Sequence, residues 1–532
     1  MQLGYPDLSA GEAYKCLLLC DAVGDTADEY HGPTAAALRD LIQQIPLVER
    51  IRLLKGELHA DKHPPTREPG EDMDVEVDVW VREHYLPLSY RLLCMGLFRL
   101  GCYKDAHTFA HDARAKGYGY DLWISDIWQA CPEAVERLGH DRDTISNKKS
   151  WPNSGLVRRE VYPWNEWEPD RMQELPLLNE MMASVAPKLE IRAVELPGLA
   201  DGDSDSVMQL GVFAKGDISP GEVILEETSM LTANNKLQDA LCDACSADLP
   251  GLDEEGGDNV RQCQYCDVVF CSQDCLERAE KSYHVAVCGA DLDALLRDVP
   301  PKEAADSLYA LLLLRTIAMS EAQGCHPLEL KEVRFIWGDF HNISVQDHFQ
   351  PPSMAWAERS QSLQQMQGNL PVTLPFSFDH NIRLPLQMLE KMGINPFTEH
   401  KFDVWVFNTL YAKSRGTASA RLSGLGGRAV RGPEVSAVHP MWCMANHSCD
   451  PNVDWEWGGS IKFWARQERV AWTRADGTTE VKSSAGIKKG EEILNHYCDV
   501  DLPVNERREW ARGALGGDCR CDRCMYEAGD RT

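Results

Sequence analysis

The chain has 532 residues, which is long enough for two to four domains that each bury a core. Its 54 lysines and arginines face 83 aspartates and glutamates, so the formal net charge is −29. This acidic balance argues against general binding to nucleic-acid phosphates, and it is compatible with a basic protein substrate.

The N-terminus and the apolar runs favour an intracellular chain. Residues 1–7 lack a basic stretch that leads into an apolar core, so the sequence shows no secretory signal. The longest apolar run, 308–319, is interrupted by Arg315 and is shorter than the about 20 residues that span a bilayer. Nineteen cysteines in such a chain indicate thiolate metal sites rather than disulfides. We expect a nuclear or cytoplasmic protein with no membrane contact.

Helical spacing of apolar residues dominates the first third of the chain, 1–171. The clearest stretches are 13–23, 34–54 and 86–115. An acidic, proline-containing segment, 64–78, predicts a loop or linker. The segment 151–171 is rich in tryptophan and proline, and it predicts an extended connector that packs against its neighbour.

Short strands and turns replace this helical pattern beyond residue 188. Alternating and β-branched residues predict strands at 189–194, within 207–227 and at 453–457.

Between and after these strands, further helices and one loop are expected. Apolar stripes at 304–319 and 384–392 predict two helices with buried faces. The Gly- and Arg-rich segment 414–432 predicts a mobile loop.

Metal-ligand residues form four close pairs between positions 242 and 288. The pairs are Cys242 with Cys245, Cys263 with Cys266, Cys271 with Cys275, and His284 with Cys288. Thiolate sulfur and imidazole nitrogen are the ligands that Zn²⁺ prefers in closed tetrahedral sites. Eight of them suffice for two sites, and incidental buried cysteines explain so regular a spacing poorly. The segment predicts a two-zinc module that unfolds without its metal.

The densest group of chemically active residues is 446–452, which reads NHSCDPN. Asn446, His447 and Asn452 offer hydrogen-bond donors and acceptors, and Pro451 stiffens the chain. The stretch resembles the NHSC-x-PN segment of the SET-domain lysine methyltransferases. In that family such residues contact the cofactor, while Asn452 is expected to stabilise the local fold.

Two later motifs extend this resemblance. The residues GEEI at 490–493, followed by Tyr497, resemble the stretch that carries the family's active-site tyrosine. The resemblance implies that Tyr497 is catalytic and orients the lysine amine; a packed aromatic residue is the alternative. Cys519, Cys521 and Cys524 resemble the family's post-SET zinc ligands, and the family pattern supplies Cys449 as the fourth ligand.

The flanking segments resemble known modules as well. The segment 242–288 resembles a MYND finger, which in this family is associated with protein contacts. That resemblance implies interleaved ligands, with Cys242, Cys245, Cys271 and Cys275 on one Zn²⁺ and Cys263, Cys266, His284 and Cys288 on the other. The stretch 100–113 resembles the turn and second helix of a tetratricopeptide (TPR) repeat, with an ordinary helical hairpin as the alternative.

The resemblance implies an α+β multidomain chain. In it, a SET-domain β-fold is split by a MYND zinc finger and a helical insertion, and an α-helical TPR-like region precedes it. The expected parts are a helical TPR-like region at 1–171, the N-terminal half of SET at 188–241, the MYND zinc finger at 242–288, a mainly helical SET insertion at 289–435, the SET C-terminal core at 436–500 and a post-SET zinc-binding tail at 501–532.

The resemblance also implies S-adenosylmethionine as cofactor and three Zn²⁺ ions, two in the finger and one in the tail. The expected cofactor-binding residues are Gln209, Leu210, Gly211, Asn408, Asn446, His447 and Tyr497. Asn408 is included because 402–408 resembles a family helix that ends in an asparagine; a capping or turn residue is the alternative. Two positions depart from the family: Gln209, where glycine is usual, and Gly517, where an aromatic residue is common.

The implied reaction is methyl transfer from S-adenosylmethionine to the ε-amine of lysine in a histone or another lysine-rich protein. The departures at Gln209 and Gly517 support a second hypothesis. In it, the chain is a scaffold whose MYND finger and helical region recruit protein partners, and whose SET fold has weak or no activity. A zinc-dependent nucleic-acid binder is a third hypothesis, which the charge and the finger's spacing oppose.

Overall fold

The computed structural model divides the chain into two compact units. The first comprises Met1–Arg158, Ser344–Asn369 and Pro375–Arg383, and the second comprises Arg159–Ile343, Leu370–Leu374 and Leu384–Thr532. The residues that the structure describes are 4–46, 48, 73–138, 146–151, 153–158, 161–197, 206–235, 241–250, 256–290, 292, 295, 304–336, 373–421, 433–515 and 517–529.

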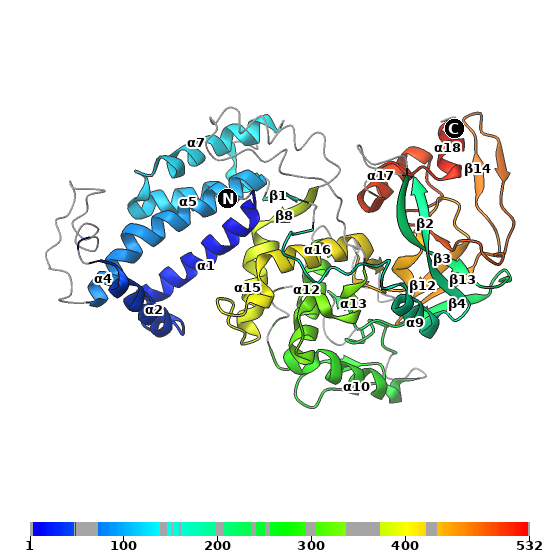
Figure 1. Ribbon diagram of the computed structural model, residues 1–532, viewed down its shortest axis with the longest axis horizontal. Helices are drawn as coiled ribbons and strands as arrows, with labels where there is room; N and C mark the ends of the chain where they lie inside the picture. Colours follow the sequence, from blue (N-terminus) through cyan, green and yellow to red (C-terminus); the bar gives the residue numbers. More distant parts are fainter. Residues whose placement is uncertain are drawn as a thin grey trace. The chain divides into compact units, whose positions relative to one another are not determined.

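The described part of the first unit is mainly helical, as expected for the N-terminal third (Figure 1). Its α-helices are α1 (Pro6–Gly24), α2 (His31–Gln44), α4 (Met73–Trp80), α5 (Leu86–Leu100), α6 (Tyr103–Ala113) and α7 (Leu122–Arg137). Single π-helical turns lie at Val81–Tyr85, Arg114–Tyr118 and Asp379–Arg383, and a 3₁₀ turn lies at Lys148–Ser150. Strand β1 (Ser154–Arg158) pairs with β8 (Thr373–Ser377).

Helices α1 and α5 pack closely because small residues line their contact. A Cβ atom added at Gly96 would lie 2.7 Å from the carbonyl oxygen of Pro6 and 3.0 Å from the Cβ of Ala10. Ala10 and Leu97 are fully buried. Glycine at position 96 therefore lets the two backbones approach to a distance that a larger residue would prevent.

The turn between α5 and α6 forms a helical hairpin, which both interpretations of 100–113 share. Gly101 ends α5 with a φ of 88°, in the left-handed region that favours glycine. Ala106, Ala110 and Ala113 are fully buried, so α6 packs through small side chains. The assignment of this hairpin to a tetratricopeptide repeat stays a prediction.

The predicted loop at 64–78 is wrong for its last residues, which belong to α4; residues 64–72 lie outside the described residues. The helix is stabilised by burial of Val77 and by Arg39 of α2, whose Nε donates to Asp74 Oδ1 at 2.7 Å. Some of the acidic residues that suggested a linker lie instead on the exposed side of this packed helix.

The second unit contains the predicted strands at 189–194, within 207–227 and at 453–457. A hairpin joins β2 (Leu189–Pro197) to β3 (Ser206–Ala214). Two three-stranded sheets have the orders β12–β13–β4 and β5–β10–β9, and the pairs β6–β7, β11–β16 and β14–β15 complete the described strands. Their bounds are β4 (Val223–Glu227), β5 (Thr232–Asn234), β6 (Arg261–Gln262), β7 (Val269–Phe270), β9 (Ser419–Arg421), β10 (Val435–Ala437), β11 (Asn446–His447), β12 (Val453–Trp457), β13 (Ile461–Ala465), β14 (Ala471–Thr473), β15 (Thr479–Val481) and β16 (Leu494–Asn495).

Strands from distant parts of the sequence share these sheets (Figure 1). Leu225 of β4 lies opposite Phe463 of β13, and Ala233 of β5 lies opposite Ser436 of β10. The Leu225 and Phe463 side chains are each 1% exposed and belong to one buried core. The core of the second unit is therefore built from segments on both sides of a long insertion.

Helices of the second unit include those expected at 304–319 and 384–392. Its α-helices are α9 (Leu175–Val185), α10 (Gln273–Ser282), α12 (Ala304–Gln323), α13 (Lys331–Arg334), α15 (Leu384–Lys391), α16 (Val404–Thr417), α17 (Val504–Leu515) and α18 (Asp522–Ala528). Short 3₁₀ turns lie at Gly257–Asn259, His284–Ala286, Pro327–Glu329, His400–Phe402 and Trp442–Met444. Among the residues described, no helix is both long and apolar enough to cross a membrane.

The loop expected at 414–432 begins later than predicted. Helix α16 continues to Thr417 and β9 follows at Ser419–Arg421, because β9 pairs with β10. Residues 422–432 lie outside the described residues.

The connector at 161–171 packs into the second unit through aromatic rings. Trp167 stacks on His326 with a centroid distance of 3.8 Å and an interplanar angle of 7°. Trp405 of α16 lies 5.8 Å from Trp167. An ion pair of 2.8 Å joins Lys413 Nζ to Glu168 Oε2 beside this stack. The predicted packing role of the connector is confirmed for these residues.

Candidate metal centres and cofactor site

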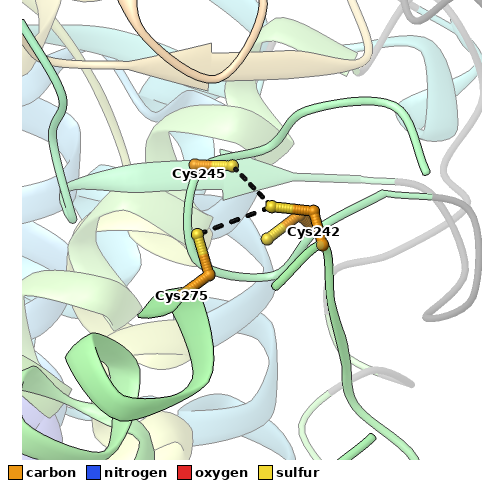
Figure 2. A group of neighbouring side chains, drawn as sticks. Cys242, Cys245 and Cys275 are labelled. Atoms are coloured by element: carbon orange, nitrogen blue, oxygen red, sulfur yellow. Dashed lines mark hydrogen bonds between the residues drawn. The ribbon is translucent and has the colours of Figure 1, made fainter. Parts of the chain in front are cut away.

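The first group of finger ligands, Cys242, Cys245, Cys271 and Cys275, gathers at the start of α10. Their sulfur atoms all lie within 4.8 Å of one another. The Sγ atoms of Cys245 and Cys271 are 3.8 Å apart, and those of Cys271 and Cys275 are 3.6 Å apart. Figure 2 shows the thiols of Cys242, Cys245 and Cys275 pointing toward one another. The Ser272 hydroxyl caps α10 by accepting from the Cys275 N–H at 3.2 Å, which fixes that ligand's backbone.

The second group of finger ligands contains Cys263, Cys266, His284 and Cys288. The Nε2 atom of His284 lies 3.3 Å from Cys263 Sγ and 3.6 Å from Cys266 Sγ. The Sγ atoms of Cys263 and Cys288 are 3.7 Å apart. The structure thus brings the eight finger residues together in the predicted interleaved sets.

A buried ion pair anchors the finger to the helix that follows it. Arg315 of α12 lies with its Nη2 3.2 Å from Asp243 Oδ2 and donates to the Asp243 carbonyl at 2.8 Å. Its guanidinium carbon also lies 3.5 Å from the centroid of the Tyr283 ring. Tyr283 in turn donates its hydroxyl to Asp243 Oδ2 at 2.7 Å. The finger is therefore held to α12 by an ion pair and by a cation–π contact.

The third group joins Cys449 to the tail residues Cys519, Cys521 and Cys524. Their sulfur atoms also lie within 4.8 Å of one another, and the Cys449 and Cys524 sulfurs are 3.4 Å apart. The Cys449 N–H donates to Cys521 Sγ at 3.4 Å. Cys449 and Cys524 are fully buried, so this group lies inside the fold.

Two buried arginines hold the tail group in place. Arg507 of α17 is 1% exposed, and its Nη2 lies 3.8 Å from Cys524 Sγ and 2.6 Å from Glu527 Oε2. Arg523 donates from Nη1 to the Cys449 carbonyl at 2.7 Å and also pairs with Glu527. Positive charge beside sulfur favours the thiolate form that binds metal ions.

The sulfur separations fit metal coordination and do not fit disulfides. Sulfurs that share one tetrahedral Zn²⁺ at about 2.3 Å lie about 3.8 Å apart, whereas a disulfide bond is about 2.05 Å long. The measured sulfur–sulfur distances run from 3.4 to 3.8 Å. All nineteen cysteines are free of disulfides, as the sequence predicted. Each of the three groups could therefore hold a metal ion.

The motif at 446–452 meets the segment that carries Tyr497 through the parallel pair β11–β16. Asn446 lies opposite Leu494, and His447 lies opposite Asn495. The Asn452 amide reinforces this junction, because its Nδ2 donates to the Glu492 carbonyl at 2.7 Å and its Oδ1 accepts from the Leu494 N–H at 2.8 Å. Asn452 thus has a structural role in the local fold.

The Asn446 side chain connects this junction to β3. Its Nδ2 donates to the Leu210 carbonyl at 3.0 Å and to Glu492 Oε1 at 2.7 Å. A Cβ atom added at Gly211 would lie 2.5 Å from Glu492 Oε1 and 3.1 Å from Asn446 Nδ2. A larger residue at position 211 would therefore displace the Glu492 carboxylate from its place beside Asn446. Burial raises the pKa of Glu492, and the hydrogen bond from Asn446 opposes that shift.

Tyr497 is held at both its backbone and its hydroxyl group. Its N–H donates to His447 Nδ1 at 3.0 Å, and its hydroxyl donates to the Ala445 carbonyl at 2.9 Å. Burial raises the pKa of Tyr497 well above that of an ordinary tyrosine. The side chain is therefore a neutral phenol near neutral pH.

His447 lies between Tyr497 and the tail group. Its Nε2 is 3.4 Å from Cys449 Sγ, and burial lowers the pKa of His447 to about 4. The ligand atoms of His447, Cys449 and Cys498 also lie within 4.8 Å of one another. The Tyr497 N–H needs an acceptor at Nδ1, so the ring proton occupies Nε2 and leaves no lone pair there for a metal ion. These three residues therefore do not form a further metal site.

Two further expected cofactor residues, Asn408 and Gln209, lie on α16 and β3. Asn408 sits within α16, and its Nδ2 donates to the Tyr162 hydroxyl at 3.1 Å. The expected helix end at Asn408 is wrong, and so is the capping alternative, because buried residues such as Leu410 extend the packed helix. Gln209 lies on β3 opposite Val194, two residues before Gly211.

The sequence interpretation did not identify two residues of the site, Glu492 and Arg507. Glu492 lies inside the GEEI motif, so the second acid of that motif was a usable signal. Arg507 is one of several charged residues on α17, and only its burial beside Cys524 distinguishes it.

Comparison with known proteins adds a family match to this geometry. A family model for the SET domain matches residues 209–498, which is more than half of the chain. The N-lysine methyltransferase SMYD2 of Homo sapiens is 28% identical over 97 residues, which cover 18% of each chain. The histone-lysine N-methyltransferase SET5 of Yarrowia lipolytica is 32% identical over 82 residues, or 15% of each chain.

A SET and MYND domain-containing protein of Dictyostelium discoideum is 30% identical over 84 residues, which cover 15% of this chain and 13% of that protein. These matches span less than a fifth of the length of the curated relatives.

Proposed function

The chain belongs to the SET domain family, and on that premise we propose that it is an S-adenosylmethionine-dependent protein-lysine N-methyltransferase. The observation that carries the proposal is the junction of Asn446 and His447 with Tyr497. Both segments lie within the matched SET domain, and their side chains converge although about 50 residues separate them.

The chemistry of this junction suits a cationic cofactor. The Glu492 carboxylate is partly buried beside Gly211 and Asn446, and burial raises its pKa. A nearby positive charge offsets the cost of burying a carboxylate, and S-adenosylmethionine carries both a sulfonium and an ammonium group. When bound, the cofactor supplies an electrophilic methyl group. Leu210, Gly211, Asn446 and His447 hold it in this proposal, and Gln209 borders it.

Tyr497 acts by placing the lysine amine. Its hydroxyl proton is donated to the Ala445 carbonyl, so the phenol oxygen keeps lone pairs that accept from the amine. A free lysine has a pKa of about 10.4, and a desolvated site lowers it, which frees the lone pair that attacks. Because the pKa of Tyr497 is raised, the tyrosine is not the base that takes the proton. It fixes the approach of the nucleophile.

Each metal group holds one Zn²⁺ in this proposal, two in the finger and one in the tail. The sulfur separations and the all-thiolate or Cys₃His ligand sets support zinc. The tail ion fixes Cys449, which follows His447 by two residues, so it stabilises the cofactor site directly.

The proposed substrate is a lysine-rich protein, with histones among the candidates. The names of the relatives from Homo sapiens and Yarrowia lipolytica support lysine and histone-lysine methylation, respectively. The net charge of −29 suits a basic substrate. The MYND-like finger and the helical hairpins of residues 1–158 are the proposed surfaces for protein partners, within an intracellular setting.

Two departures from the family favour the second function, a scaffold with a weak SET domain. Gln209 and Gly517 depart from the family. Such a chain would bind protein partners without methylating them.

Mass spectrometry of methyl transfer from isotopically labelled S-adenosylmethionine tests the proposal. Wild-type protein loaded with zinc is expected to label lysines of a histone mixture. Tyr497→Phe is expected to lose about 100-fold in rate, because the amine is no longer oriented. Tyr120→Phe is the matched control, since this tyrosine is 45% exposed in the first unit. Absence of labelling by folded, zinc-loaded protein contradicts the enzyme and favours the scaffold.

A further inference from the structure

We infer that His447 is a positioning residue whose imidazole ties the backbone of Tyr497 to the thiolate of Cys449. Through this ring, the tail metal centre sets the placement of the tyrosine. The catalytic consequence rests on the proposed function, whereas the mechanical link does not.

The first step of the argument concerns the protons of the imidazole. The backbone N–H of Tyr497 can only donate, so His447 Nδ1 accepts at 3.0 Å and carries no proton. The neutral ring then has its proton on Nε2, which faces Cys449 Sγ at 3.4 Å. A metal-bound thiolate is an acceptor, so both ring nitrogens are satisfied in one orientation.

The second step concerns the support of Tyr497. Strand β16 ends at Asn495, so the Tyr497 N–H lies beyond the parallel ladder with β11. It bonds to a side chain instead of to a neighbouring strand. The His447 and Tyr497 rings also contact each other, with centroids 5.1 Å apart. Rotation of the imidazole would therefore remove both a hydrogen bond and a packing surface from the tyrosine.

The third step concerns the fixed end of the link. Cys449 is fully buried, and its carbonyl accepts from Arg523 Nη1 at 2.7 Å. Its sulfur lies 3.4 Å from that of Cys524. A metal ion shared by these sulfurs would hold the acceptor of the Nε2 proton still. Loss of the ion frees that acceptor, and the ring can then turn.

A competing path runs through packing alone. Cys498 follows Tyr497, is 3% exposed, and has its sulfur within 4.8 Å of Cys449 Sγ. If packing transmits the effect, Cys498→Ala should break it. If the imidazole transmits the effect, Cys498→Ala should leave it intact.

The test is amide exchange at Tyr497 in the full-length, zinc-loaded protein labelled with ¹⁵N-tyrosine. The chain has fifteen tyrosines, and the resonance of interest is the one that Tyr497→Phe removes. Cys519→Ser weakens the tail centre without touching His447, and it is expected to speed exchange at Tyr497 at least tenfold. In His447→Asn, the shorter side chain keeps an acceptor near the position of Nδ1 but does not reach Cys449. In the His447→Asn background, Cys519→Ser is expected to change the exchange rate at Tyr497 less than twofold.

An equal response to Cys519→Ser in the wild-type and His447→Asn backgrounds would overturn the inference, and so would loss of the response in Cys498→Ala.

A reverse measurement needs no tail cysteine variant. Zinc release to a chromogenic chelator should show one of three ions leaving about tenfold faster in His447→Asn, the lower end of what loss of such a partner costs a metal site. His111→Gln is the control, because that side chain is 63% exposed. Unchanged release in His447→Asn would contradict the bond to Cys449.

Kinetics separate the link from the proposed function. In His447→Asn, kcat for methyl transfer at saturating S-adenosylmethionine should fall about 10-fold or more, in addition to any rise in KM for the cofactor. A rise in KM with unchanged kcat would contradict a positioning role. If wild-type protein transfers no methyl group, the proposed function fails, and the exchange and release measurements still decide the link.

Discussion

The metal groups of the finger and of the tail use the same kinds of ligand, but the ligands of the tail group lie much farther apart in the sequence. All eight finger ligands come from one segment, 242–288, and that segment is anchored to α12 through Arg315. The tail group instead combines Cys449 with Cys521, 72 residues further along the chain. Cys449 itself follows His447 by two residues in the NHSC motif.

This difference separates a local metal site from one that shapes another site. A metal ion in the finger stabilises a module that builds little core of its own. A metal ion in the tail fixes residues that touch the proposed catalytic tyrosine and the proposed cofactor site. Loss of metal from the two regions should therefore have unequal consequences.

The largest expected effect comes from removing one ligand in each region. Cys521→Ser should lower methyl transfer to a short lysine peptide at least 100-fold, because Cys449 loses its fixed position. Cys288→Ser should change it less than threefold, since its group has no hydrogen bond to the junction in the described residues. Both variants should lose one of three zinc ions by elemental analysis. Equal losses of activity would show that the two regions are not distinct.

The finger's anchor gives the next largest effect. Arg315→Met should lower the free energy of unfolding by about 3 to 5 kcal/mol, because it leaves the Asp243 carboxylate buried without its cation. The exposed pair of Arg82 with Asp78 is the matched control, and Arg82→Met should cost less than about 1 kcal/mol. Urea denaturation followed by circular dichroism measures both. Similar costs for the two variants would contradict the anchoring role.

The pH dependence of the unfolding free energy tests the packing of the segment that precedes Asn446. The expected change is up to about 3 kcal/mol. The Glu227 carboxylate is 6% exposed and accepts from the backbone N–H groups of Met441 and Trp442. Burial raises its pKa from 4.5 to about 7, so the folded state binds more protons than the unfolded state between these values. Its contribution to stability is therefore present below pH 4.5 and is lost as the pH rises to about 7.

Subtracting the unfolding free energy of Glu227→Gln from that of the wild type isolates this carboxyl. The difference should fall as the pH is raised from 4.5 to 7 and then level off. A difference that rises over the same range would contradict the raised pKa.

The sequence predicted those features that depend on neighbouring residues. The finger ligands could be paired because each pair is closely spaced, and the family pattern supplied Cys449 for the tail. The position of Asn408 could not be read in this way, because its partner Tyr162 lies 246 residues away. The role of the His447 ring was also hidden, since it depends on where the Tyr497 N–H points. Helix α4 was mistaken for a linker because its acidic residues are visible in the sequence and its packing against α2 is not.

Calorimetric titration with S-adenosylmethionine tests the central claim most directly. Zinc-loaded wild-type protein and Cys288→Ser should bind the cofactor with similar, micromolar affinity, whereas Cys449→Ser should bind at least tenfold more weakly. No binding by folded, zinc-loaded wild-type protein would contradict the account. Equal binding by wild type and Cys449→Ser would contradict the claim that the tail metal centre holds the cofactor site.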